Sequence, residues 1–427
     1  MVDWSIRCLV TPGFVSSALL ILAVPISQAE PVSISGTLDN RFSDNMGRVA
    51  ANEQSDLETR LGLSIRHVKD PGTCNSILDG QLGYGYWLED TFDPKVYTDL
   101  GFTGDCELTR GFKWLVSDRL SDVTESSQRP DVPDNSTRKN VFTTGPQYTL
   151  FLTSRDQLQF TLQYQNTEFE EPEESDSERV IASTAWNHLF SSTLNGGISL
   201  SSNRAELDSG VEIDRNTASL TFAKTWPATK LDGSLGVSEI ETSFGTGSQK
   251  SDALVGDLSL VREINPSADF FLNFSRELSD QTSDFDFQFG EFEFNLTETT
   301  GVEVTALRAG VDKRFSDGTT LNFVLSASQS DYLASDNTEE RAGTDVFVTR
   351  PLTARISLSS GLGFDYLTYE QDDSDDTVLE FNLGASYKLS RDLGVNMKVG
   401  HERRTSDVLS REYQENWILI GLSYRFL

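Results

Sequence analysis

The chain has 427 residues, of which 37% are hydrophobic and 10% are aromatic, and its formal net charge is -31. This apolar and aromatic content excludes a disordered chain, so we expect an ordered structure. The acidic excess repels nucleic acid and anionic surfaces at long range, which argues against a nucleic-acid-binding protein. We attribute it to solvated loops or a saline habitat rather than to a basic partner.

The first predicted element is an export signal. An apolar run over Phe14–Ile26 follows Arg7, and the small residues of Ser27-Gln28-Ala29 suit signal peptidase. The run is shorter than the roughly 18 residues that a membrane span needs. We expect residues 1–29 to be removed and the mature chain to begin at Glu30.

No later stretch reaches the roughly 20 apolar residues of a spanning helix, so a membrane role requires strands of about 10 residues. Residues 157–165 alternate polar and apolar side chains without a fault. Such alternation places the apolar side chains on one face and mostly amides on the other. Further strands are expected upstream near Ser33–Asn40, Asp56–Val68, Ile77–Leu88, Lys95–Leu100 and Phe112–Leu120, and downstream over residues 321–327, 356–366, 379–387 and 418–426.

Two kinds of connection alternate along the chain. Short turns are predicted near residues 154–156, 191–193, 226–228, 265–267, 316–318, 350–352 and 390–392. Longer acidic or polar segments fall between them, at residues 168–178, 245–252, 280–300, 331–340, 370–376 and 404–413. This pattern is typical of outer-membrane barrels, whose short turns face the periplasm and whose long loops face outside.

The spacing of the short turns also resembles the period of propeller blades. A blade contains four short strands, however, whereas each period here holds two long strands and one acidic insertion. We therefore predict that residues 30–427 form a single up-and-down antiparallel transmembrane β-barrel, all-β in class. It should have about 20 strands, within a range of roughly 16–20, with both termini in the periplasm of a Gram-negative bacterium.

Several segments resemble a family of β-barrel porins encoded in exopolysaccharide and exosortase-associated loci of Gram-negative bacteria. The resemblance rests on Asp39-Asn40, on residues 140–146 (NVFTTGP), on residues 276–280 (RELSD) and on residues 415–426 (ENWILIGLSYRF). It implies an outer-membrane barrel that serves polysaccharide secretion, with no catalytic residue to carry over. Implied partners are outer-membrane lipid, the barrel-assembly machinery, polysaccharide and secretion components.

The end of the chain departs from the usual pattern of barrels. Such chains commonly finish on an aromatic residue that the assembly machinery reads, whereas here Leu427 follows Phe426. We expect Tyr424 and Phe426 to form the assembly signal.

Few residues of the sequence are candidates for catalysis. The histidines are His67, His188 and His401, and none is placed by strand phase beside a carboxylate or nucleophile in a cavity. We therefore predict that the chain is not an enzyme and holds no cofactor or metal.

Two cysteines remain after the signal is removed, Cys74 and Cys106. Both are expected near the periplasmic rim on neighbouring hairpins, where a disulfide can form. The alternative is two free thiols too far apart to bridge.

Two other segments leave alternatives open. The acidic runs at residues 168–174 and 372–376 are either solvated loop tips or calcium ligands without a defined register. Residues 284–294 alternate aromatic and polar side chains until Gly290. They form either strands that extend above the membrane or an aromatic platform for sugars.

If the lumen is open, polar residues of inward parity should line it. In the last strands these are Arg355, Asp365, Glu380, Lys388, Asn396, Lys398, Glu402, Arg404 and Arg425. Both signs of charge are present, which favours a wide hydrated passage for polar polymers over a strongly ion-selective pore. Three functions stay open: a passage or accessory in exopolysaccharide secretion, a general diffusion porin for small polar solutes, or a closed structural or adhesive barrel.

Overall fold

The structure is a computed structural model. It describes residues 32–69, 72–171, 174–245, 247–284, 288, 292, 294–296 and 301–427, so the predicted signal segment lies outside the described residues. Its strands are β1 (Ser33–Ser43), β2 (Asp56–Lys69), β3 (Cys74–Trp87), β4 (Lys95–Thr109), β5 (Phe112–Thr124), β6 (Ser136–Phe151), β7 (Asp156–Phe169), β8 (Ser177–Ser191), β9 (Leu194–Leu207), β10 (Glu212–Trp226), β11 (Thr229–Phe244), β12 (Gly247–Asn265), β13 (Ala268–Ser279), β14 (Val302–Arg314), β15 (Thr320–Tyr332), β16 (Asn337–Pro351), β17 (Ile356–Tyr369), β18 (Ser374–Lys388), β19 (Leu393–Ser406) and β20 (Tyr413–Arg425). Two short 3-10 helices, η1 (Pro133–Asn135) and η3 (Leu409–Arg411), lie in connections.

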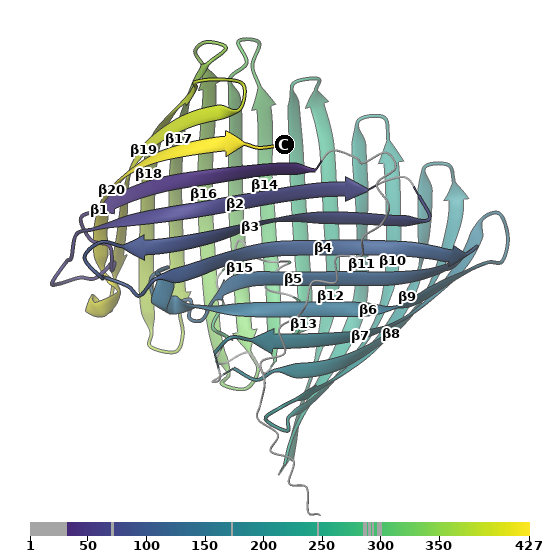
Figure 1. The fold of residues 1–427 in the computed structure, drawn as a ribbon. Coiled ribbons are helices and arrows are strands. Elements are labelled where there is room, and N and C mark those ends of the chain that lie inside the picture. Colours follow the sequence, from purple (N-terminus) through teal and green to yellow (C-terminus); the bar gives the residue numbers. More distant parts are fainter. Residues whose placement is uncertain are drawn as a thin grey trace, which may run out of the picture.

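The sheet closes on itself. Every strand pairs antiparallel with its neighbours in the sequence, and β1 also pairs with β20, with Ser35 opposite Arg425. In Figure 1 the strands β3 to β6 in front cross the strands β10 to β13 behind steeply, as the strand tilt of a barrel requires. The predicted antiparallel barrel of about 20 strands is confirmed. In the described part of the chain, no helix has the length and apolar character to cross a bilayer.

The two ends of the barrel differ. One end, called here the short-turn end, carries tight connections such as residues 110–111 and 192–193, together with the start of β1 and the end of β20. The other, called the long-loop end, carries the connections 44–55, 125–135 and 280–301. The predicted alternation of connections is therefore present, because odd-numbered and even-numbered hairpins turn at opposite ends.

Several predicted long loops are instead strand. Residues 245–252 belong mostly to β12, so the connection from β11 is residues 245–246, and the connection from β15 to β16 is residues 333–336. The charges that suggested loops lie on strands that continue as paired hairpins. An example is Lys250 Nζ, 2.8 Å from the Glu239 carboxylate on the adjacent strand.

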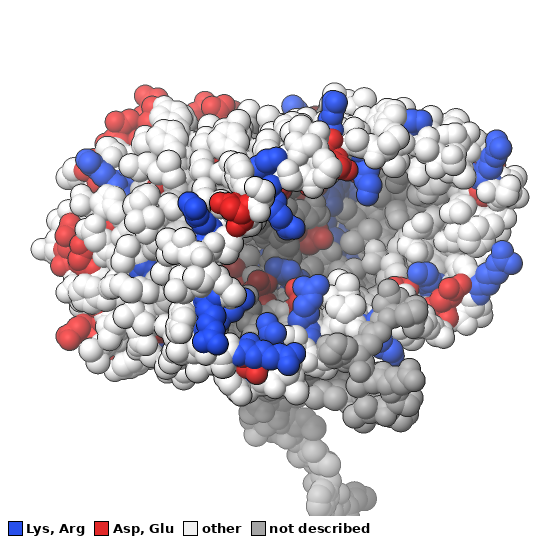
Figure 2. Space-filling model, turned by 90° about the horizontal axis from the view of Figure 1, so that it is seen from above, with Lys and Arg blue, Asp and Glu red and all other residues white. Residues whose placement is uncertain are grey.

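Side chains alternate between the outer wall and the lumen. On β10 the Leu220 side chain is 61% exposed on the outer face, whereas Ser219 faces the lumen side beside Gly236. Leucine, valine and aromatic residues form the same exposed face on nearly all strands, and a lipid bilayer is the surroundings in which such a face is stable. Figure 2 shows Lys, Arg, Asp and Glu side chains gathered around a hollow.

Candidate functional site in the lumen

In the connection between β13 and β14, residues 280–301, the described residues 280–284, 292 and 294–296 fold into the lumen. Asp280 is fully buried, and Arg179 on β8 donates from Nη2 to its Oδ1 at 2.6 Å. Burial alone would raise the pKa of Asp280, but the guanidinium groups of Arg179 and Arg215 hold that pKa below its ordinary value. This buried ion pair joins the loop to the wall of β8, five strands away from β13.

Backbone carbonyls of the same loop are held by two further strands. Lys139 on β6 donates from Nζ to the carbonyl oxygens of Gln281 and Ser283, both at 2.6 Å. The Thr167 hydroxyl on β7 donates to the carbonyl oxygen of Thr282 at 2.7 Å. The loop is thus anchored along three consecutive strands, β6 to β8, and narrows the lumen beside them.

Two apolar side chains of this loop are buried against the wall. Phe292 and Phe294 are buried against the inward residues Val302 and Val304 of β14 and against Tyr332 of β15. Phe292 and Phe294 therefore neither lie in strands nor offer an open aromatic platform, and residues 285–287, 289–291 and 293 of the predicted segment lie outside the described residues. The physical reason is that phenylalanine gains more free energy in an apolar cluster than at a solvated loop tip.

The connection between β5 and β6, residues 125–135, crosses to the opposite wall. The Ser127 hydroxyl lies 2.9 and 2.8 Å from the two carboxylate oxygens of Glu339 on β16, and Tyr369 on β17 donates to the Ser127 carbonyl oxygen at 3.0 Å. The two inward loops also meet, since the Leu296 N–H donates to the Glu125 carbonyl oxygen at 3.0 Å.

Two cavities remain beside the loops, on the side of β1 to β4 and β16 to β20. The larger, about 500 Å³, is called the eyelet cavity; the strands and loops of β1 to β6 and Leu419 line it. The smaller, about 310 Å³, is lined by β16 to β20 and shares Arg41, Arg48 and Asp131 with the first. The polar space next to the wall is therefore a crescent around Arg48.

Arg48 organises this crescent. Its guanidinium contacts Glu402 at 2.7 Å, Glu415 at 3.0 Å and the Asp131 carbonyl oxygen at 3.1 Å. Glu415 is fully buried and also accepts from Arg41 at 2.5 Å. Burial disfavours the charged form of Arg48, but Glu402 and Glu415 raise its pKa above the ordinary value. The crescent thus contains fixed charges of both signs.

The structure brings four of the predicted lumen residues together. Asp365, Glu380, Glu402 and Arg404 all line the smaller cavity. Asp365 accepts from Arg341 Nε at 3.0 Å, and the other three lie on adjacent strands β18 and β19.

The remaining predicted lumen residues lie nearer the short-turn end. Asn396 lies inward beside Gly421, and Lys398 follows it on the same face of β19. Lys388 and Arg425 are the last residues of β18 and β20, and Arg355 is not in a strand but in the turn before β17. These three residues lie at the rim of the short-turn end, and none of them lines the crescent.

Sequence reasoning missed the residues of the larger cavity. Arg41 follows the same inward phase as Asp39, and glycines alternate with aromatics over residues 83–87, so both carried a periodic signal. Arg48 had no such periodic signal, because it lies in a loop and has a left-handed backbone with φ 49°.

Two further side-chain pairs lie near the short-turn end. Cys74 and Cys106 face each other across β3 and β4, with Cα atoms 4.0 Å apart and the sulfurs joined. His188 Nδ1 lies 2.7 Å from Asp156 Oδ1 at the short-turn end, beside Trp186. This pair is an Asp–His contact that the sequence did not reveal.

The acidic run at residues 372–376 contacts arginine side chains. Arg411 pairs with Asp372, and Arg404 donates from Nε to Asp376 Oδ2 at 2.8 Å. Two of its carboxylates therefore serve ion pairs at the long-loop end. At the end of β20, the Tyr424 and Phe426 rings lie 5.1 Å apart on the exposed outer face.

Comparison with known proteins supports the resemblance found in the sequence. Residues 341–426, from within β16 to the end of β20, match the family model described as "Putative beta-barrel porin 2". No curated protein matches the sequence. Together with the closed sheet and its apolar outer face, the family match identifies a porin-like β-barrel of the outer membrane.

The chain also matches solved structures of outer-membrane proteins at low identity. The siderophore receptor PirA from Pseudomonas aeruginosa is 12% identical with a TM-score of 0.45, over 93% of this chain and 81% of that chain. The alcaligin receptor FauA from Bordetella pertussis is 10% identical with a TM-score of 0.42, over 92% and 76%. A loop-deletion mutant of OmpT from Vibrio cholerae is 12% identical with a TM-score of 0.35, over 93% and 99%.

Proposed function

We propose that this porin-like barrel provides an outer-membrane passage for polar saccharide chains, as a channel or accessory of exopolysaccharide secretion. The observation that carries the proposal is the polar crescent beside the inward loops, where Arg48, Glu402 and Glu415 present fixed charges of both signs. A hydroxyl-rich chain exchanges hydrogen bonds with such a wall at every step. The resemblance to the porin family of exopolysaccharide loci supports the same substrate class.

The inward loops favour a second candidate, a closed structural barrel. Residues 125–135 reach the opposite wall, and the loop at residues 280–301 is anchored by a buried ion pair. If both loops stay docked and no space connects the two ends, the barrel displays its outer loops without conducting. General diffusion of small solutes is the third outcome of the test below.

The experiment is deletion of the gene, with extracellular polysaccharide measured in the deletion strain and in a strain that carries the gene on a plasmid. We expect export to fall on deletion and to return on complementation. Unchanged export would refute the secretion role. A deletion strain that loses uptake of small polar solutes instead would indicate a general porin.

We further propose that the chain is not an enzyme. The Asp156–His188 pair lies next to the aromatic ring of Phe190, and neither residue lines the eyelet cavity or the smaller cavity of the crescent. The expected export orientation, with the short-turn end and both termini in the periplasm, belongs to the same proposal. Protease added to intact cells should therefore cut at the long-loop end and leave the termini intact.

A further inference from the structure

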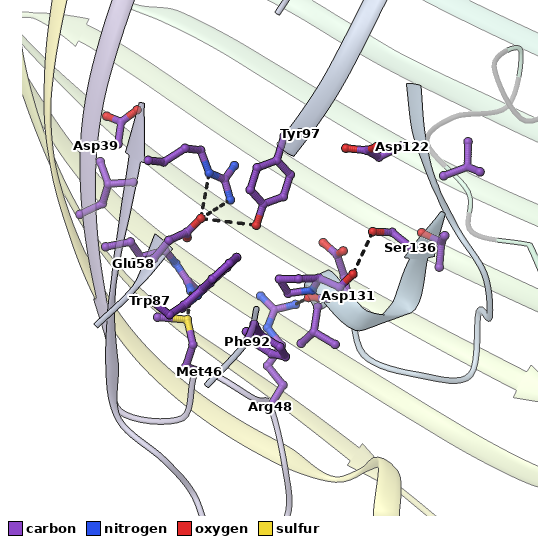
Figure 3. A pocket seen from close by; sticks show the side chains of 17 residues that line it. Asp39, Met46, Arg48, Glu58, Trp87, Phe92, Tyr97, Asp122, Asp131 and Ser136 are labelled. Atoms are coloured by element: carbon purple, nitrogen blue, oxygen red, sulfur yellow. Dashed lines mark hydrogen bonds and ion pairs between the residues drawn. The ribbon is translucent and has the colours of Figure 1, made fainter. Parts of the chain in front are cut away.

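The eyelet cavity has the size and position of a ligand site. Its volume of about 500 Å³ lies within the roughly 300–1,000 Å³ of small-molecule sites. It lies where residues 131–133 of the β5–β6 loop approach the wall formed by β1 to β4, beside the proposed passage (Figure 3). A solute that moves through the crescent therefore enters this cavity.

One wall of the cavity is polar and rigid. Glu58 is buried, and its Oε1 accepts from Arg60 Nε at 2.9 Å and Nη2 at 2.7 Å and lies 3.4 Å from the Tyr97 hydroxyl. The Arg60 guanidinium stacks on the Tyr97 ring, 3.7 Å from its centroid. Donors and acceptors therefore stand side by side with their charges paired. Such a wall suits hydroxyl groups, which donate and accept, better than a free ion.

The other wall is apolar. Phe92 is half-buried at the cavity, and its ring meets Trp87 edge to face with centroids 5.4 Å apart. The loop that carries Phe92 is fixed by Asp56, which accepts from the N–H groups of Glu89 at 2.9 Å and Thr91 at 3.1 Å. A pyranose ring has apolar C–H faces and a hydroxyl edge, so it matches one apolar wall and one polar wall at once.

Trp87 supplies an independent observation. Its side chain is 1% exposed, it lines the cavity, and its indole N–H has no acceptor in the described part of the chain. A buried donor without an acceptor is unfavourable, and such groups in folded proteins call for an explanation. The same burial closes this N–H to a hydroxyl in the cavity, so Trp87 contributes to the site through its ring, which packs edge to face behind Phe92.

Glycine keeps the cavity open. A Cβ at Gly85 would lie 2.9 Å from Tyr97 Cε2 and 3.1 Å from Glu58 Oε1. Any larger residue at position 85 would therefore displace the polar wall. The backbone of β3 is thus shaped to let Tyr97 and Glu58 face the cavity.

We propose that the eyelet cavity is a binding subsite for a neutral pyranose oligosaccharide. The inference deepens the proposed passage by naming its substrate class, and it rests on that proposed function. The cavity is lined by four carboxylates (Asp39, Glu58, Asp122 and Asp131) and three guanidinium groups (Arg41, Arg48 and Arg60). Its charges therefore offer no net attraction to an anion, and the chain's charge of -31 repels polyanions. A neutral saccharide is therefore bound in preference to an acidic one.

The test is isothermal titration calorimetry of the purified full-length barrel in detergent with maltohexaose, with a mannuronate hexamer as the acidic comparison. Wild-type protein is expected to bind maltohexaose more tightly than the mannuronate hexamer. No binding of maltohexaose, or tighter binding of the mannuronate hexamer, would overturn the proposal.

Two tryptophan variants test the cavity itself. Trp87→Phe replaces the indole that packs behind Phe92 by a smaller ring, and the loss of this aromatic contact should weaken maltohexaose binding about three- to tenfold. Trp114→Phe is the matched control, because it makes the same change at a residue that does not line the cavity. Trp114 lies near the start of β5, where its Nε1 donates to Thr144 Oγ1 at 3.0 Å. Equal binding by both variants would contradict the assignment. Phe92→Ala, verified as folded by its heat-modifiable gel mobility, should weaken binding more strongly, and unchanged binding there would also contradict it.

Failure of this inference is distinguishable from failure of the secretion role. Calorimetry uses purified protein and requires no transport. A deletion strain with normal export, combined with calorimetric binding that Trp87→Phe weakens, would refute the secretion role and support the subsite. Reduced export without any binding of maltohexaose would do the reverse.

Discussion

Replacement of Asp280 by asparagine should release the loop at residues 280–301 from the wall. The Arg179 and Asp280 side chains are 1% and 0% exposed, so Asp280→Asn leaves the Arg179 charge buried without its carboxylate partner. Removal of one member of a buried pair costs about 3–5 kcal/mol. At about 1.4 kcal/mol per factor of ten, the equilibrium between docked and released loop shifts by about two to three and a half orders of magnitude.

Single-channel recording in planar bilayers detects this release. We expect Asp280→Asn to show a larger mean conductance and more frequent steps than wild type, because the loop no longer narrows the lumen beside β6 to β8. Asp284→Asn is the matched control, since it removes the same charge from an exposed residue of the same loop. Recordings of Asp280→Asn that match both wild type and Asp284→Asn would refute the reasoning.

Three other predictions follow from the fold. Because the pKa of Asp280 is held below its ordinary value, its contribution to docking is complete above about pH 5 and is lost as the pH falls through the lowered pKa. Conductance should therefore rise in strong acid in the wild type, whereas in Asp280→Asn this acid step should be absent. Leu220→Arg should lower the free energy of unfolding of the barrel in lipid vesicles by about 2–4 kcal/mol, measured by urea unfolding. The neighbouring lumen-side variant Ser219→Arg should change this free energy little. Equal losses for the two variants would mean that the faces are assigned wrongly. Replacing Cys74 and Cys106 by serine should lower stability by about 2–4 kcal/mol in the same assay and abolish its sensitivity to reductant, while a wild-type protein with two alkylatable thiols would contradict the disulfide.

The wall of the barrel was predictable because its signal is local. The alternation of residues 157–165 predicts a strand, and β7 spans Asp156–Phe169. Each strand repeats the same requirement of an apolar outer face and a polar inner face, so the period of two is visible in every segment. The strand ends were less predictable, since paired hairpins such as β11 and β12 carry their charges beyond the apolar belt.

The interior was only partly predictable. Asp365, Glu380 and Glu402 were found from strand phase, because inward residues on adjacent strands must meet. The contact of Ser127 with Glu339 joins residues 212 positions apart and depends on the path of a loop. No periodicity encodes such a path, so the two inward loops, and with them the narrowing of the lumen, appeared only in the structure.

The conductance of the wild-type barrel in planar bilayers tests the central claim most directly. The account predicts a steady but small current with weak preference between cations and anions, because loops narrow a lumen whose crescent holds fixed charges of both signs. Reproducible insertion of folded protein without any steady current would contradict a passage and leave a closed barrel. A large current with the conductance of an unobstructed barrel would contradict the inward loops.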